Sequence, residues 1–138
     1  MSLTIFRLLL DFGLVVLIWI IQLIVYPSFH YYDRNSLVEW HSNYTSRFSF
    51  IVIPLMLGQL GIAFYSLTLT INFNTIINLV IIVIIWLITF LIFVPIHSKI
   101  SRGKISDRML SSLVRKNWLR TIFWNTLFAY NFAQLSNI

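Results

Sequence analysis

A run of 51 residues, from Phe48 to Ser98, contains no Asp, Glu, Lys or Arg. Each crossing of a bilayer takes about 20 apolar residues, so this run is long enough to cross twice. Two further stretches without these residues, 12–32 and 121–138, are each close to the length of one crossing. The sequence therefore predicts an all-α, polytopic membrane protein whose four transmembrane helices form a single bundle.

The composition agrees with this class and excludes several others. Charged residues make up 10% of the chain, whereas a soluble domain carries about 25%. The net charge of +6 is attributed to loops that orient the chain in the membrane, and no nucleic acid is expected as a partner. The absence of cysteine excludes disulfides, thiolate metal sites and thiol catalysis. No P-loop or similar motif occurs, so a nucleotide cofactor is not predicted.

The helix boundaries are set by a few punctuating residues. Pro27 should end the first helix, and Asn35 or Ser36 should cap the second. Gly103 breaks the basic linker after the third helix, and Ser106 should cap the fourth. The first segment lacks the basic flank and cleavage site of a secretory signal, so it is read as a retained helix. The four helices are expected over about residues 3–26, 36–69, 75–96 and 107–136.

The positive charges predict the orientation. Arg7 is the only basic residue on its side of the expected bundle, and nine others lie in or beside the two longer loops. Basic loops stay in the cytoplasm, so both termini should lie on the non-cytoplasmic side of a cell (inner) membrane. The nine are Arg34, Arg47, Lys99, Arg102, Lys104, Arg108, Arg115, Lys116 and Arg120.

Polar residues recur on one face of each expected helix, and lipid offers such residues no partner. They should therefore face the bundle interior. Asp11 either pairs with Arg7 near the outer interface or handles protons, and Gln22 and Gln59 either join helices or bind substrate. The candidate substrate-binding residues are Gln22, Tyr26, Gln59, Trp86, Phe90, Phe93 and Trp124.

The three histidines, His30, His41 and His97, all fall toward the cytoplasmic end. Imidazoles near the carboxylates of Asp33 and Glu39 could hold a metal, although the spacing matches no ligand motif. A metal or haem bound by the three histidines and a set of hydrogen-bonded histidines at the interface both stay open. The cofactor is accordingly predicted as none or as an unidentified metal or haem.

Arg120 lies about one turn inside the fourth helix, with Asn117 on the turn before it. A charge at this depth is costly unless it is paired or reaches water. Its side chain either extends toward the cytoplasm or faces the bundle, where its planar fork would bind an anionic or carbonyl oxygen. The candidate catalytic residues are His97, His41, Arg120 and Asn117.

Three segments carry a family resemblance. "QLIVYP" (22–27), "VPIH" (94–97) and "NWLRTIFW" (117–124) resemble the small four-helix membrane proteins of the anthrone oxygenase-like family. In that family a Pro-x-Asn step ends the third helix and an Asn-x-x-Arg step opens the fourth. Pro95, Asn117 and Arg120 match these steps, whereas His97 stands where the family has asparagine. The resemblance implies oxidation of a polycyclic anthrone by dioxygen without a recognised cofactor.

Three functions follow from these features. The first is a membrane oxidoreductase or oxygenase acting on a lipophilic small molecule in the cytoplasmic half of the bundle, with His97 or His41 as general base. The second is a non-catalytic membrane subunit or lipid-binding protein that docks through its basic loop, as a homo-oligomer or within a larger complex. The third, a transporter or channel, would need a polar path across the membrane.

Overall fold

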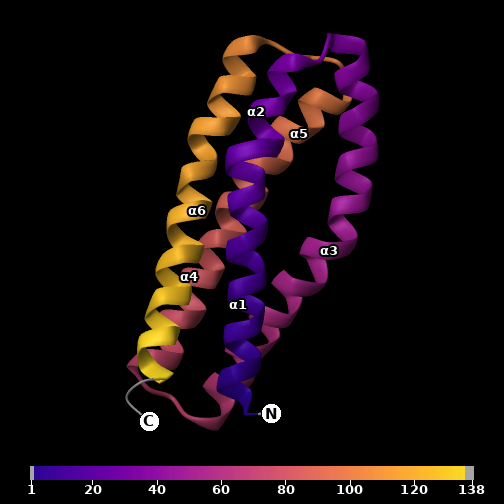
Figure 1. Cartoon of the computed structure of the whole chain (residues 1–138). Helices are drawn as coiled ribbons and strands as arrows, with labels where there is room; N and C mark the ends of the chain where they lie inside the picture. The colour runs from indigo at the N-terminus through magenta and orange to yellow at the C-terminus, as the bar shows by residue number, and fades with distance from the viewer. Residues whose placement is uncertain (1, 136–138) are drawn as a thin grey trace.

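The computed structural model describes residues 2–135, which are helical throughout except at short connections (Figure 1). Four long helical stretches run up and down in one bundle, as predicted. The second and fourth are single α-helices, α3 (Arg34–Leu69) and α6 (Asp107–Leu135). The other two stretches each consist of several helical segments. The first stretch comprises α1 (Leu3–Ile20), the π-helical turn η1 (Ile21–Val25), α2 (Tyr26–Ser28) and the 3₁₀ turn η2 (Phe29–Tyr31). The third comprises α4 (Phe73–Ile88), the π-helical turn η3 (Thr89–Phe93) and α5 (Val94–Ser101).

The helices pack around α1, which contacts both α3 and α6, while α4 contacts the same two helices from the other side. The start of α1 and the end of α6 lie at one end of the bundle, beside the α3–α4 turn (Figure 1). The connections from α2 to α3 and from α5 to α6 lie at the opposite end. The core between the helices contains fully buried side chains such as Leu14, Phe29 and Leu113.

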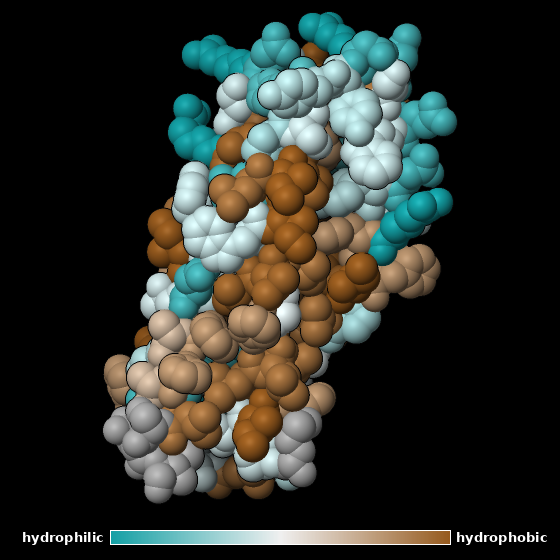
Figure 2. Space-filling model, viewed as in Figure 1, coloured by the Kyte–Doolittle hydropathy of each residue, from teal (hydrophilic) through white to brown (hydrophobic). Residues whose placement is uncertain are grey.

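Three of the four stretches, Leu3–Tyr31, Arg34–Leu69 and Phe73–Ser101, are long and apolar enough to cross a membrane. The fourth is of similar length but carries Arg115, Lys116 and Arg120 in its first half. Many large apolar side chains face outward, and Figure 2 shows them as a broad band below a hydrophilic end. Such a surface matches a bilayer better than water.

The prediction that Pro27 ends the first helix is wrong, and so is the end of the third helix near residue 96. Both helices continue, to Tyr31 and Ser101, because a π-helical turn precedes each proline. Pro27 and Pro95 each occupy the first turn of the α-helical segment that follows the π turn. A first-turn position needs no backbone N–H, so proline is tolerated there.

The cap of α3 also differs from the prediction. Asp33, and neither Asn35 nor Ser36, is the N-cap, because its carboxylate accepts hydrogen bonds from both the backbone N–H (3.0 Å) and the hydroxyl (2.6 Å) of Ser36. These bonds hold the pKa of the exposed Asp33 carboxyl below its usual value. The helix therefore begins at Arg34, two residues earlier than expected.

Two other boundaries are confirmed. Ser106 accepts hydrogen bonds from the N–H of Met109 with its hydroxyl (3.2 Å) and its carbonyl, so it caps α6. Gly103 has a φ of +71°, which a residue with a Cβ rarely adopts, so it ends the preceding helix as predicted. The expected end of the fourth helix, residue 136, lies outside the described residues.

Candidate functional site

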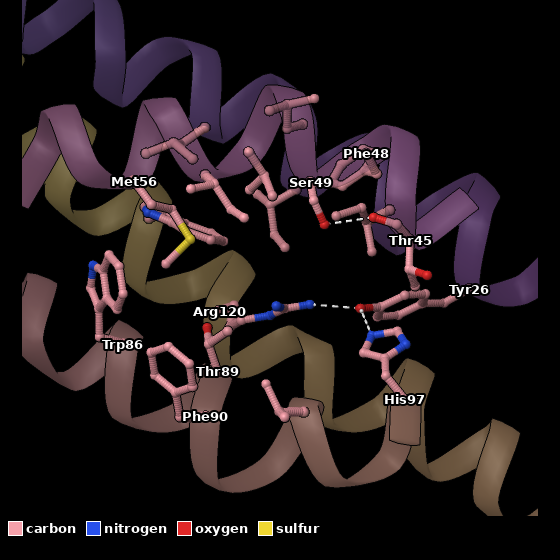
Figure 3. A pocket seen from close by; sticks show the side chains of 18 of the residues that line it. Tyr26, Thr45, Phe48, Ser49, Met56, Trp86, Thr89, Phe90, His97 and Arg120 are labelled. Carbon is pink, nitrogen blue, oxygen red and sulfur yellow. Dashed lines mark hydrogen bonds between the residues drawn. The ribbon is translucent and has the colours of Figure 1, made fainter. Parts of the chain in front are cut away.

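A pocket of about 260 Å³ lies inside the bundle between α1, α3, η3 and α6 (Figure 3). Its walls are mostly apolar and include Leu14, Ile18, Phe48, Val52, Met56 and Trp86. Ile53, Phe90 and Val94 also line it and are about half exposed, at 49%, 54% and 48%. The pocket therefore opens sideways, between α3 and the π turn η3, onto the apolar surface of the bundle.

The polar end of the pocket is formed by Arg120, Tyr26 and His97 (Figure 3). Arg120 is only 7% exposed, and its Nη2 donates a hydrogen bond of 2.9 Å to the hydroxyl oxygen of Tyr26. Its guanidinium carbon lies 3.7 Å from the ring centroid of Phe93, a cation–π contact. Nη1 makes no hydrogen bond to any described residue, so its two N–H groups are free to bind a ligand.

Asn117, which does not line the pocket, holds the guanidinium of Arg120 in place. Its Oδ1 accepts from Nε (3.0 Å) and Nη2 (2.6 Å) of Arg120, while its Nδ2 donates to Oε1 of Gln22 (2.9 Å). Gln22 in turn donates to the backbone carbonyl of Val114 at 3.2 Å. No carboxylate among residues 2–135 forms an ion pair with Arg120, so the buried positive charge is balanced by neutral groups alone.

A row of hydrogen bonds runs from Tyr26 toward the hydrophilic end of the bundle. The Tyr26 hydroxyl lies 2.9 Å from Nε2 of His97, and Nδ1 of His97 lies 2.7 Å from Nε2 of His41. Nδ1 of His41 lies 3.3 Å from the hydroxyl of Ser101, which is exposed at the end of α5. His41 itself is completely buried.

The two π turns determine which side chains meet at this site. Gln22 lies within η1 and Tyr26 follows it directly, while Phe93 is the last residue of η3 and His97 comes one turn later. A π turn adds one residue to the helical repeat and is frequent at functional sites. Each turn therefore rotates the residues beyond it toward the pocket.

A second polar network lies toward the other end of the bundle. Asp11 accepts hydrogen bonds from Gln59 (2.6 Å) and Asn131 (2.7 Å), and Gln59 also accepts one from the indole of the pocket residue Trp124 (3.3 Å). Arg7 donates instead to Ser66. The predicted Arg7–Asp11 pair is thus not found as a direct contact; Asp11 is only 1% exposed and its oxygens are satisfied by two amides.

The structure brings together two of the three histidines that were considered as metal ligands. His30 is exposed, away from the contact between His41 and His97. All four ring nitrogens of His41 and His97 take part in hydrogen bonds, so in this arrangement none is free to coordinate a metal. Within residues 2–135 no group of three or more His, Asp or Glu side chains is placed to hold a metal ion.

The predicted site residues divide into three groups. Six line the pocket, namely Tyr26, Trp86, Phe90, His97, Arg120 and Trp124. Four more, Gln22, His41, Phe93 and Asn117, lie behind these and contact Arg120, Asn117 or His97. Gln59 belongs to the Asp11 network instead.

Sequence reasoning missed several contributors. Tyr44, Ser49 and Thr89 line the pocket, although their types and positions do not distinguish them from ordinary helix-surface residues. Thr45 also lines it; its spacing from His41 predicts the same inward face of the second helix, but it is not among the predicted site residues. Ser101 could have been found, because it lies four residues after His97 and so on the same helical face.

No protein-family model matches this chain, and no similar curated protein or solved structure was found.

Proposed function

We propose that the protein spans a membrane and acts as an oxidoreductase of the oxygenase type on a lipophilic small molecule with an enolisable carbonyl group. The observation that carries the proposal is the junction of an apolar pocket with a buried guanidinium and a tyrosine–histidine pair. The apolar walls suit a ring system, and the free Nη1 of Arg120 suits an oxygen that becomes negatively charged during the reaction.

The first step is the removal of a proton from a methylene carbon that is conjugated with the substrate carbonyl, which in anthrone is the methylene across the central ring. The carbonyl oxygen accepts a hydrogen bond from Nη1 of Arg120. The Tyr26 oxygen takes the carbon-bound proton while its own hydroxyl proton passes to Nε2 of His97, 2.9 Å away. The product is an enolate whose oxygen is held by Arg120, and general base catalysis of this kind typically contributes about 10²–10⁴ in rate.

The second step uses dioxygen as the oxidant. The enolate reacts with dioxygen, so that a methylene carbon becomes a carbonyl carbon: one oxygen atom is retained in the product and the other leaves as water together with the two hydrogens of the methylene. Dioxygen is apolar and would reach the pocket through its sideways mouth. The resemblance to the anthrone oxygenase-like family supports a tricyclic anthrone as the first probe.

The test is oxygen consumption by the purified protein with anthrone in mild detergent. Arg120→Gln should lower the rate by about 100-fold or more, as expected when an oxyanion donor is removed. Arg115→Gln, an exposed position on the same helix, is the matched control and should keep the wild-type rate. Helical content by circular dichroism establishes that Arg120→Gln still folds. A folded Arg120→Gln protein with an unchanged rate contradicts the proposed role.

A second candidate function, non-catalytic binding to anionic lipid or a partner, is favoured by one observation. Six exposed basic residues gather at the end of the bundle near Ser101, and each gains about 1 kcal/mol at an anionic surface. They are Lys99, Arg102, Lys104, Arg108, Arg115 and Lys116. Changing Lys99, Arg102 and Lys104 to Gln separates the two functions, because this variant should lose binding to anionic vesicles but keep its oxygen consumption.

A further inference from the structure

We propose that Tyr26, His97, His41 and Ser101 form a proton-transfer chain that carries the proton of the bound ligand from the pocket to the hydrophilic end of the bundle. The inference rests on the proposed function in one respect, since the ligand must supply the proton. It goes further because it assigns proton transfer to His41 and Ser101, which do not line the pocket.

The geometry of the chain is continuous. Its three steps measure 2.9 Å, 2.7 Å and 3.3 Å between the hydrogen-bonded atoms, and each imidazole uses one nitrogen toward the pocket and the other toward the surface. The chain begins at a buried tyrosine on the pocket wall and ends at an exposed serine. It therefore crosses the otherwise apolar packing between α2, α3 and α5.

One placement of the protons lets every hydrogen bond of the chain pass a proton outward. Arg120 can only donate, so the Tyr26 oxygen accepts from it and has its own hydroxyl proton to donate. Nε2 of His97 is the nearby acceptor for that proton. His97 then carries its proton on Nδ1 and donates to Nε2 of His41, which in turn carries its proton on Nδ1 and donates to Ser101. In this placement both imidazoles are neutral, with the proton on Nδ1.

The transfer step balances without a lasting charge on either ring. The ligand gives a proton to the Tyr26 oxygen as Tyr26 gives its proton to Nε2 of His97. His97 releases its Nδ1 proton to Nε2 of His41, and His41 releases its Nδ1 proton to solvent at Ser101. The ligand is left as an anion facing Arg120 and Tyr26, one proton has reached the surface, and both rings now carry their proton on Nε2.

A proton that stopped at His97 would be unfavourably placed. His97 is joined to Arg120 through a single bridging oxygen, that of Tyr26, and no carboxylate among residues 2–135 contacts either side chain. Two positive charges so close together in a buried site are costly. Transfer of the proton through His41 to solvent at Ser101 avoids placing this second positive charge on His97.

The first measurement is the nitrogen spectrum of protein labelled with ¹⁵N-histidine, because a ring nitrogen that carries a proton is distinguished from one that does not. In the ligand-free protein, His41 and His97 should both carry their proton on Nδ1, and the exposed His30 serves as the reference. Doubly protonated rings, protons on opposite nitrogens of the two rings, or both protons on Nε2 would each overturn the proposal.

The second measurement adds a matched pair of probes, 2-naphthol and its methyl ether, 2-methoxynaphthalene. Only the naphthol has a proton to give. It should move the proton of both rings from Nδ1 to Nε2 together, whereas the ether should leave both unchanged. Binding of 2-naphthol without this change means that the chain is only structural.

The third measurement uses His41→Phe, which keeps a ring at the contacts with Phe29 and His97 but removes both nitrogens. In this variant 2-naphthol should no longer shift the proton on His97, while Ser98→Ala on the same helix as Ser101 should behave as wild type. A normal shift in His41→Phe refutes the chain. These readouts need no turnover, so an absence of oxygen consumption would count against the proposed function and leave the chain intact.

Discussion

Arg120 is the residue on which the site depends, because it is a buried cation that has no acidic partner among residues 2–135. Its charge is stabilised by Asn117, by the Tyr26 oxygen and by the face of the Phe93 ring. Removing a polar partner from a buried charge costs more than the hydrogen bond itself, since the charge stays buried. An anion bound here, as the proposed function requires, would therefore also stabilise the protein.

Asn117→Leu should lower the free energy of unfolding by about 2–4 kcal/mol, because it leaves Nε of Arg120 without its partner and Oε1 of Gln22 with only the longer bond from the Thr121 hydroxyl, 3.4 Å. The measurement is reversible unfolding in mixed SDS–detergent micelles. Asn125→Leu is the matched control and should cost no more than about 1.5 kcal/mol, since Asn125 bonds only neutral groups, the Trp19 indole and the Thr121 carbonyl. Equal losses in the two variants would contradict this account of Arg120.

At the residue scale, the sequence predicts contacts between residues of the same helix but not contacts between residues of different helices. Asn117 and Arg120 are three apart on one face, so their contact follows from helical periodicity alone. The contact between His41 and His97 joins two helices 56 residues apart in sequence, and no spacing rule predicts it. The placement of Gln59 with Asp11 instead of in the pocket depends on helix packing in the same way.

At the scale of elements, the two π turns are the features that convert plain helices into a site. Each comes just before a proline, and together they set the rotation of Tyr26 and His97 about their helix axes. The presence of these helices could be predicted from the long apolar runs. Their continuation past Pro27 and Pro95 could not be predicted, because it depends on a local change in hydrogen bonding that composition does not reveal.

Deleting Ile24 should convert η1 into ordinary α-helix and leave Tyr26 at the site, because the deletion removes the one residue that a π turn adds to the helical repeat. Ile24 lies within η1 and is 63% exposed, so its own side chain contributes little to the packing. The deletion should therefore keep binding of 2-naphthol and helical content near wild type, whereas inserting an alanine after Ile24 should turn Tyr26 by about 100° and abolish binding. Loss of binding in the deletion variant, or retained binding in the insertion variant, would contradict this account of how η1 positions Tyr26.

At the scale of the whole molecule, hydrophilic and apolar surfaces are separated along the bundle axis. Exposed basic residues gather at the end that holds the α5–α6 connection, and a broad apolar band follows (Figure 2). The four-helix bundle itself could be predicted from the uncharged runs and from the basic residues between them. The pocket could not, since its shape arises from the way in which four helices meet.

Single cysteines test the orientation, and the natural sequence contains none that would interfere. In intact cells a membrane-impermeant maleimide should label Thr70→Cys in the α3–α4 turn but not Lys104→Cys, which lies at the basic end. Lysis should make both positions reactive. The reverse pattern would invert the orientation, and labelling of both in intact cells would rule out a chain that crosses the membrane.

The sideways mouth of the pocket, between α3 and η3, changes what is meant by ligand concentration. A molecule that arrives through the acyl chains is sampled at its concentration in lipid, so solubility in the bilayer acts as a first selection before any side chain is touched. Under the proposed function, the protein would then need to recognise only one polar group, the part of the ligand near Arg120 and Tyr26. An affinity expressed per volume of water would consequently vary with the amount of lipid or detergent in the sample, and only its value per mole of lipid would be a property of the protein.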